Sequence, residues 1–283
     1  MIDKIDLHSH STASDGTYTP RELALLAAWQ DIRALALTDH DTVSGVREFA
    51  AACGEYGVEA VAGVEISAQY HKTMHIVGLF VDYEDEVLCE KLDKLRNARA
   101  VRNKKMLELL RKNGFDISEA DILSQKEGAS LSNTGRAHIA RSMVEKHYVR
   151  SVNEAFEKYL KKGNSCYVKR ITYSPEESIR IIKDAGGVAV LAHPVFITED
   201  YDTLYGLAQE LKEYGLDGME CYYNCYTERF SKMCADICKK TGLLQSGGSD
   251  FHGLNKPDVE LGTVSSGYVP YSLLNTIKEQ RCL

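Results

Sequence analysis

No stretch of this sequence approaches the roughly 20 consecutive apolar residues that a membrane-spanning helix requires, and its N-terminus, Met1–Lys4, lacks the features of a signal peptide. Basic residues are also fewer than acidic ones: the sequence has 34 lysines and arginines and 41 acidic residues, which gives a formal net charge of −7. Binding of long nucleic-acid duplexes requires a basic face, so this balance argues against it. The eight cysteines are too sparse for a disulfide scaffold. We therefore expect a soluble cytoplasmic protein with reduced thiols.

Motifs for phosphate-binding loops and for nucleophilic serines are missing as well. Their absence argues against a P-loop NTPase and an α/β-hydrolase, so any catalysis must use other groups. Internal repeats and low-complexity tracts are absent too, and 283 residues suit one large α/β domain with or without a smaller insertion.

Strand-like and helix-like segments alternate at both ends of the chain, as they do in (β/α) barrels. In the N-terminal part the pattern predicts strands at 4–7, 34–37, 59–66 and 75–81, and helices at 19–29 and 43–56. From Pro175 onward it predicts strands at 188–191, 218–221 and 243–245, and helices at 176–185, 201–214 and 227–241. A polar break at 70–72 predicts a hairpin between the third and fourth strands. We therefore predict an α/β fold, a barrel formed by residues 1–82 and 170–283.

The intervening residues 83–169 show helical periodicity and no convincing buried strand. A stripe from Leu88 through Met106 to Leu110 has the spacing of one helix face, and 139–145 and 155–160 add two more helices. We predict a helical insertion domain that covers the active site.

Residues of the types that bind metals recur at or just past the C-terminal ends of the predicted strands. They are His8, His10, Asp15, Asp39, His40, Glu65, His75, His193, Asp250 and His252. Singly, most have a second interpretation: Asp15 suits a turn before Gly16, and Asp39 suits a helix N-cap. Glu65 is more telling, because a carboxylate ending an apolar run is costly to bury unless it is paired or coordinated. Since independent accidents would not all fall at strand ends, the set predicts a polynuclear metal site at one end of the barrel.

Two further groups of residues have other interpretations. Asp6 lies on the same strand face as His8 and His10, and we interpret it as an acceptor that orients an imidazole. A structural zinc site is one interpretation of four cysteines, but core packing explains their spacing better; they are Cys221, Cys225, Cys234 and Cys238.

Basic residues of the predicted insertion also have two interpretations. Arg96, Arg99, Arg102 and Lys105 form a ridge on one predicted helix face. This ridge is either a solvated charged surface or a surface that binds phosphate. Arg136, beside His138, offers the same choice, because a guanidinium can bind phosphate through two hydrogen bonds.

The order of these motifs resembles the polymerase and histidinol phosphatase (PHP) family of metal-dependent phosphoesterases. The motifs are His8-x-His10, Asp15, Asp39-His40, Glu65, His75, His193-Pro194 and Asp250-x-His252. Within the family, 5–11, 36–41, 135–140 and 247–253 are similar to the branch of 3′,5′-nucleotide bisphosphate phosphatases and 5′-to-3′ exoribonucleases. One departure is Ala137, where this branch often has proline. The resemblance covers the whole chain and implies a distorted seven-stranded (β/α)7 PHP barrel.

The resemblance also implies two to three divalent metal ions, in the first place Mn²⁺ and otherwise Fe²⁺ or Zn²⁺. One ion would be held by His8, His10, Glu65 and Asp250, and another by Asp15, His40, His193 and His252. Glu65 would bridge to a third site that uses His75. His138 is the candidate for a further ligand there, unless it binds substrate.

The implied reaction is hydrolysis of a nucleotide phosphomonoester by a metal-activated hydroxide. The substrate would be a 3′,5′-bisphosphorylated nucleotide or the 5′ end of a short oligonucleotide. Catalytic roles fall on Asp15, His193 and Arg136, with His193 or a metal-bound water as proton donor, and substrate contacts fall on Arg99, Arg102, Asn103, Arg136 and His138. Two alternatives remain open: a histidinol-phosphate phosphatase, and a non-catalytic module stabilised by metal.

Overall fold

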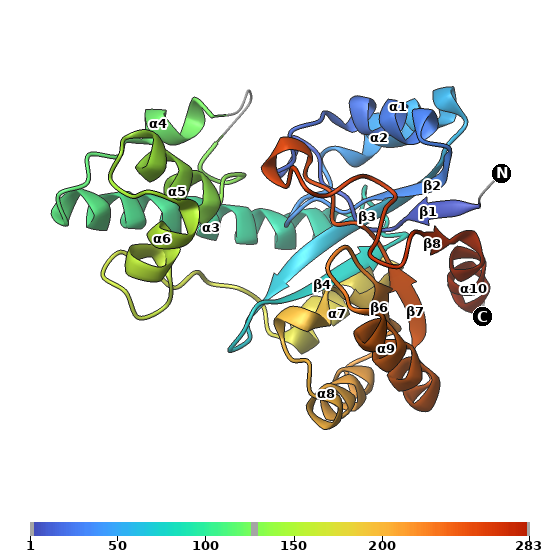
Figure 1. Ribbon diagram of the computed structural model, residues 1–283. Helices are drawn as coiled ribbons and strands as arrows, with labels where there is room; N and C mark the ends of the chain where they lie inside the picture. Colours follow the sequence, from blue (N-terminus) through green and yellow to red (C-terminus); the bar gives the residue numbers. More distant parts are fainter. Residues whose placement is uncertain (1–2, 126–129, 282–283) are drawn as a thin grey trace. The chain divides into compact units, whose positions relative to one another are not determined.

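The computed structural model describes residues 3–125 and 130–281 (Figure 1). It divides into two compact units, one formed by residues 1–92 with 173–283 and the other by residues 93–172. We call them the barrel unit and the helical unit. The first boundary falls within the long helix α3 (Glu86–Lys112), at 92/93 rather than at the predicted 82/83, and the second falls at 172/173 rather than 169/170.

An eight-stranded sheet lies at the centre of the barrel unit, in the order β7-β6-β5-β4-β3-β2-β1-β8. Its strands are β1 (Lys4–Asp6), β2 (Ile32–Leu37), β3 (Glu59–Ala68), β4 (Met74–Leu79), β5 (Val188–Leu191), β6 (Gly218–Tyr222), β7 (Leu244–Gly247) and β8 (Val269–Pro270). Neighbours are parallel except for the predicted β3–β4 hairpin, the β4–β5 pair and the β1–β8 pair.

The two ends of the sheet meet beside the predicted metal ligands. The Leu7 N–H donates to the Gly247 oxygen at 3.2 Å, and the Asp250 N–H donates to the His8 oxygen at 2.8 Å. The sheet is therefore a nearly closed barrel, which confirms the predicted fold class. The two-residue strand β8 is added to the seven that we expected.

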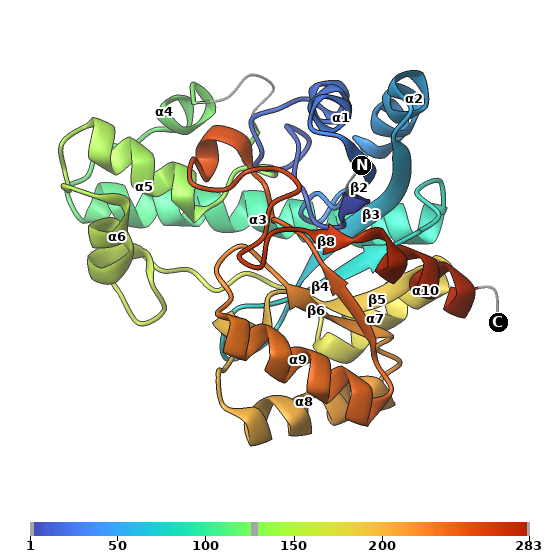
Figure 2. The ribbon, with the colours of Figure 1, turned by 45° about the vertical axis from the view of Figure 1, so that its right-hand side comes forward.

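Helices surround the strands of the barrel unit (Figures 1 and 2). They are α1 (Pro20–Trp29), α2 (Val46–Tyr56), α7 (Pro175–Asp184), α8 (Tyr201–Glu213), α9 (Glu228–Thr241) and α10 (Tyr271–Arg281), with short 3₁₀ turns at Pro194–Phe196 and Gly253–Asn255. The start of α1 follows from its sequence: Thr19 caps the backbone N–H of Glu22, the Glu22 carboxylate accepts from the Thr19 N–H, and Pro20 occupies the first turn. Helix α7 begins in the same way.

Apolar side chains of the strands form the core of the barrel. Ala34, Ala36, Val61, Val77 and Val190 are each at most 1% exposed and belong to one cluster, which α10 joins through two further buried side chains, Leu274 and Ile277. This packing fixes the strands and hence the positions of the residues that follow them.

The helical unit has a core of its own. It contains most of α3 and, in chain order, α4 (Glu119–Leu123), α5 (Arg136–Glu145), α6 (Val152–Ala155) and a π-helical turn at Phe156–Leu160. Met106, Leu110, Ile139, Met143 and Leu160 are all fully buried together. Its described residues are helices and loops, as predicted. Across the described chain, no helix is both long and apolar enough to cross a membrane.

Candidate metal centre

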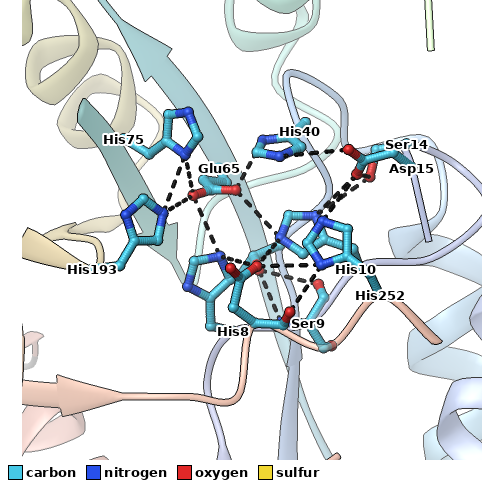
Figure 3. A network of polar contacts seen from close by, with 12 residues as sticks. His8, Ser9, His10, Ser14, Asp15, His40, Glu65, His75, His193 and His252 are labelled. Carbon is cyan, nitrogen blue, oxygen red and sulfur yellow. Dashed lines mark hydrogen bonds and ion pairs between the residues drawn. The ribbon is translucent and has the colours of Figure 1, made fainter. Parts of the chain in front are cut away.

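The barrel brings the predicted ligands together at one end (Figure 3). His8 and His10 follow β1, and His40 follows β2, where it forms an isolated parallel bridge with Glu65 of β3. His75 lies on β4 opposite Ser67 of β3. The segments after β5 and β7 supply the remaining ligands, so residues far apart in the sequence share one site.

Glu65 lies at the centre of this arrangement (Figure 3). One carboxylate oxygen, Oε1, lies 2.7 Å from His75 Nδ1 and 3.0 Å from His193 Nε2. The other, Oε2, lies 2.8 Å from His40 Nδ1 and 3.3 Å from His10 Nε2. His8 Nε2 lies 3.4 Å from Oε1 as well, so a single buried carboxylate is within reach of five imidazoles.

Three groups of ligand atoms each lie within 4.8 Å of one another: His8, His10, Glu65 and Asp250; His10, Asp15, His40 and His252; and His40, Glu65 and His75. The first group has the same members as the first predicted ion site. The third matches the predicted link between Glu65 and His75. In the second group, His10 stands where we predicted His193.

His193 lies elsewhere in the site than we predicted. It is in none of the three groups, and its Nε2 lies 3.2 Å from His75 Nδ1 and 3.0 Å from Glu65 Oε1, two members of the third group. The cause is local: His193 has a left-handed backbone, with φ of 30°, directly before Pro194. This strained turn directs the imidazole toward β4.

The site has the properties expected of an ion-binding centre. His8 Nε2 and His10 Nε2 are buried, and neither makes a hydrogen bond, although each lies 3.2–3.5 Å from carboxylate oxygens. Buried polar atoms without a partner are costly, so such atoms converging with carboxylates point to a ligand between them. Imidazole and carboxylate donors without thiolate suit Mn²⁺, Fe²⁺ or Zn²⁺. The residues present therefore fit divalent ions.

The charges of the site depend strongly on one another. Burial disfavours ionisation of Glu65, but the charges of His40, His75 and His8 outweigh this and hold its pKa well below the usual range. Burial likewise disfavours charge on His8, but Glu220, Glu65 and Asp250 raise the pKa of its imidazole well above normal. For His75 burial dominates and lowers its pKa to about 4. The carboxylates thus stay ionised and present negative charge to a cation.

Two buried aspartates hold the ligand-carrying loops. Asp39 accepts hydrogen bonds from the backbone N–H and the hydroxyl of both Ser11 and Ser14, which fixes the loop before Asp15. Asp6 accepts from the backbone N–H groups of His8 and Ser249, 3.1 and 2.9 Å away. Our prediction that Asp6 orients an imidazole was therefore wrong: it orients backbone.

Three residues of the site were not predicted. Glu220 Oε1 lies 2.7 Å from His8 Nδ1. The Tyr223 hydroxyl donates to Asp250 Oδ2 at 2.6 Å, and Lys256 Nζ contacts the same oxygen. Only Glu220 had a sequence signal: it is a carboxylate within the apolar strand 218–222, the argument that identified Glu65.

Basic side chains gather within the helical unit. Arg102 is 7% exposed, and its Nε is buried without a hydrogen-bond partner. Burial and the positive charges of Arg99, Arg136 and Arg170 hold its pKa well below the usual range. Arg136 lies over the ring of Tyr167, 5.9 Å from its centroid. Among the described residues no carboxylate pairs with Arg102, so this arginine cluster is a candidate anion site.

Two other predicted substrate contacts have structural roles. The Asn103 amide, fully buried, donates to the carbonyl oxygens of Leu131 and Thr134, at 2.8 and 2.9 Å. His138, 2% exposed, accepts at Nδ1 from the Gly135 N–H at the start of α5. Arg96, from the predicted ridge, pairs with Asp93. Of the predicted ridge, Arg99 and Arg102 therefore belong to the arginine cluster, whereas Arg96 pairs with an acidic neighbour.

The cysteines support the packing interpretation. Cys221 and Cys238 are buried with their sulfur atoms 3.6 Å apart, and Cys225 is exposed. No potential metal-binding group among residues 3–125 and 130–281 includes a cysteine. Burial raises the pKa of the Cys234 thiol, as expected for an unreactive core residue.

Comparison with known proteins agrees with this site. Residues 6–170 match the family model described as PHP domain. The chain is 37% identical over 256 residues to a 5′-3′ exoribonuclease of Haemophilus influenzae, covering 89% of this chain and 91% of that protein. It is 33% identical over 264 residues to a 3′,5′-nucleoside bisphosphate phosphatase of Chromobacterium violaceum, covering 91% and 90%.

Two solved structures share the fold. One, an amidohydrolase of Chromobacterium violaceum with bound sulfate and no metal, is 31% identical and superposes with a TM-score of 0.86 over 98% of this chain and 96% of that one. The other, a proposed metal-dependent phosphoesterase of Bifidobacterium adolescentis, is 29% identical with a TM-score of 0.84 over 97% and 95%.

The barrel, the groups of ligand atoms and the relatives together identify the protein as a hydrolase that acts on phosphoric ester bonds. The chain belongs to the PHP family of metal-dependent phosphoesterases, as the order of its motifs predicted. This assignment to an enzyme class disfavours the non-catalytic alternative.

Proposed function

We propose that this protein hydrolyses a phosphomonoester of a nucleotide, either a 3′,5′-bisphosphorylated nucleotide or the 5′ end of a short oligonucleotide. The observation that carries the proposal is that one chain holds two separate features for anions: a cluster of metal ligands around Glu65 and a buried arginine cluster around Arg102. The metal ligands of the barrel unit suit a phosphoryl group, and the arginine cluster of the helical unit suits a phosphate group by itself. The activities named for the two relatives above point to the same substrates.

At the metal centre, each residue has an inferred role. When bound, divalent ions lower the pKa of water and neutralise charge on the phosphoryl oxygens. His8, His10, Glu65 and Asp250 would hold one ion, and His10, Asp15, His40 and His252 another. His75 and His193, both beside Glu65, would serve a third site or the leaving group. Asp15 has a side chain that is 27% exposed, so we infer that the phosphoryl group enters from its side.

Within the helical unit, Arg102 and Arg136 would bind a phosphate group. A guanidinium donates two parallel hydrogen bonds to a phosphate, and the unused Nε of Arg102 is available for this. Tyr167, beside Arg136, offers a ring on which a base can stack. In this proposal Asn103 and His138 position backbone and do not contact substrate.

Phosphate release from Mn²⁺-loaded protein tests the proposal. Substrates would be adenosine 3′,5′-bisphosphate, adenosine 5′-monophosphate, a 5′-phosphorylated short RNA and histidinol phosphate, with Glu65→Gln as the inactive control. We expect turnover of the bisphosphate or the RNA at least tenfold faster than of the monophosphate. Turnover of histidinol phosphate alone would overturn the proposal in favour of a histidinol-phosphate phosphatase, and equal turnover of both adenosine nucleotides would remove the role of the second phosphate.

A further inference from the structure

The buried acid Glu220 lies on β6 and makes two contacts with segments that carry ligands. Its Oε1 lies 2.7 Å from Nδ1 of His8, which follows β1. Its Oε2 accepts a hydrogen bond of 2.5 Å from the backbone N–H of His193, which follows β5. Glu220 is 1% exposed and belongs to none of the three groups of ligand atoms. It touches the site without being one of its ligands.

These two contacts determine where the proton of His8 lies. A backbone N–H can only donate, so it fixes Glu220 Oε2 as an acceptor. A carboxylate whose Oε2 accepts presents Oε1 as an acceptor as well, so His8 Nδ1 carries the proton of the 2.7 Å contact and donates it. When His8 binds an ion as a neutral imidazole, its lone pair then lies on Nε2, the nitrogen that lies 3.4 Å from Glu65 Oε1 and 3.5 Å from Asp250 Oδ1. In that form His8 directs its one acceptor at the ion-binding group.

We propose that Glu220 is a positioning residue that sets the tautomer of His8 and the backbone of His193, and thereby prepares the site for a divalent cation. Carboxylates that accept from the second nitrogen of a metal-binding imidazole raise its basicity and fix its orientation. Because Glu220 contacts His8 and the backbone of His193 at once, it links two segments that carry residues of the site. The inference concerns ion binding and does not depend on which phosphoester is the substrate.

The variant Glu220→Gln tests this directly, because it keeps the shape of the side chain. A glutamine side chain has one oxygen that accepts and one NH₂ group that donates. Because the backbone N–H of His193 can only donate, the glutamine oxygen must face it. The amide NH₂ then faces His8 Nδ1, and the imidazole can accept from it only by moving its own proton to Nε2. The nitrogen that faces Glu65 and Asp250 would thereby lose its lone pair.

The matched control is Asp217→Asn. Asp217 also links β6 to β5, because its Oδ2 accepts from the Ala189 N–H at 2.8 Å, but it contacts no predicted ligand and pairs with Lys183. Both substitutions replace a carboxylate that accepts from a backbone N–H of β5 or of the residues after it, but only Glu220 also contacts His8. A purely structural role for Glu220 predicts similar behaviour of the two variants.

The measurements are Mn²⁺ and Zn²⁺ affinity by competition with a chelator, and ¹⁵N shifts of the histidines in the Zn²⁺-loaded protein. We expect Glu220→Gln to lose about 10- to 100-fold in affinity and to shift the His8 signals away from the Nδ1–H tautomer, while Asp217→Asn binds within twofold of wild type. Glu220→Asp, which keeps the charge but is too short for both contacts, should lose affinity to a smaller extent and serves if the glutamine variant does not fold. Affinity within twofold of wild type in the folded Glu220 variants, or an unchanged His8 tautomer, would overturn the proposal.

Discussion

Replacing Arg102 by methionine should stabilise the free protein while removing a phosphate site. The guanidinium of Arg102 is buried among Arg99, Arg136 and Arg170, and its Nε makes no hydrogen bond. Methionine keeps the apolar length of the side chain and removes the charge. The environment of Arg102 is therefore unfavourable for folding, which is common where a residue serves binding.

The expected magnitude follows from these contacts. A buried donor left without a partner costs about 1–3 kcal/mol, and more when charged. Replacing buried charges by apolar side chains of similar volume is neutral or stabilising by about 1–4 kcal/mol. Part of this gain is offset, because Arg102 Nη1 contacts the Met106 sulfur at 3.7 Å and the side chain packs along α3. We therefore expect the free energy of unfolding to rise by about 1–2 kcal/mol.

The assay is denaturant unfolding of chelator-treated protein followed by far-UV circular dichroism, with and without inorganic phosphate. Removal of metal confines the effect of phosphate to sites outside the metal centre. At 100 times its dissociation constant, a ligand stabilises the folded state by about 2.7 kcal/mol. Wild type should show such a shift and Arg102→Met should not. Lys105→Met, at an exposed position on the same helix, should change neither the free energy of unfolding nor its increase with phosphate.

A destabilised Arg102→Met variant that keeps its response to phosphate would refute this reasoning. Arg102 would then be a structural residue, and the arginine cluster would have no role in binding anions.

Further substitutions test the metal centre, the substrate contacts and the helical unit. Asp15→Ala should lower the bound metal by about one ion, and His193→Ala should do the same if His193 serves a third ion site. Both variants should reduce turnover at least about 100-fold without unfolding the protein; wild-type turnover in either variant would show that the role assigned to that residue is wrong. Arg136→Ala should raise KM or lower kcat about tenfold or more with metal content unchanged, and loss of metal would instead give Arg136 a structural role. Hydrogen bonds from Lys146 and Ser118 lower the pKa of Asp121 to about 2, so folding favours its ionised form. The stability that Asp121 contributes is therefore present above its unfolded pKa, near 3.8, and is lost as the pH falls toward 2. The difference in Tm between wild type and Asp121→Asn should accordingly be constant above about pH 5 and shrink below pH 4; a difference independent of pH would show that the charge of Asp121 is not involved.

Local sequence determined the elements of the fold and the types of ligand. Apolar strands and capped helices were predictable because their hydrogen bonds and caps are local, as at Thr19 and Pro20 of α1. The ligands were predictable because a carboxylate such as Glu65, at the end of an apolar run, needs a partner wherever the strand lies. Parallel strands then place such residues at one edge of the barrel.

Tertiary structure decided which ligands share an ion and which residues support them. His193 was predicted with Asp15, but its left-handed backbone before Pro194 places it beside Glu65 and His75. Glu220 of β6 contacts His8, which follows β1, across the closure of the sheet, and no spacing in the sequence specifies that pair. Such contacts depend on barrel closure and on the exact rotation of each strand, which are set by packing of the whole unit and not by any short segment.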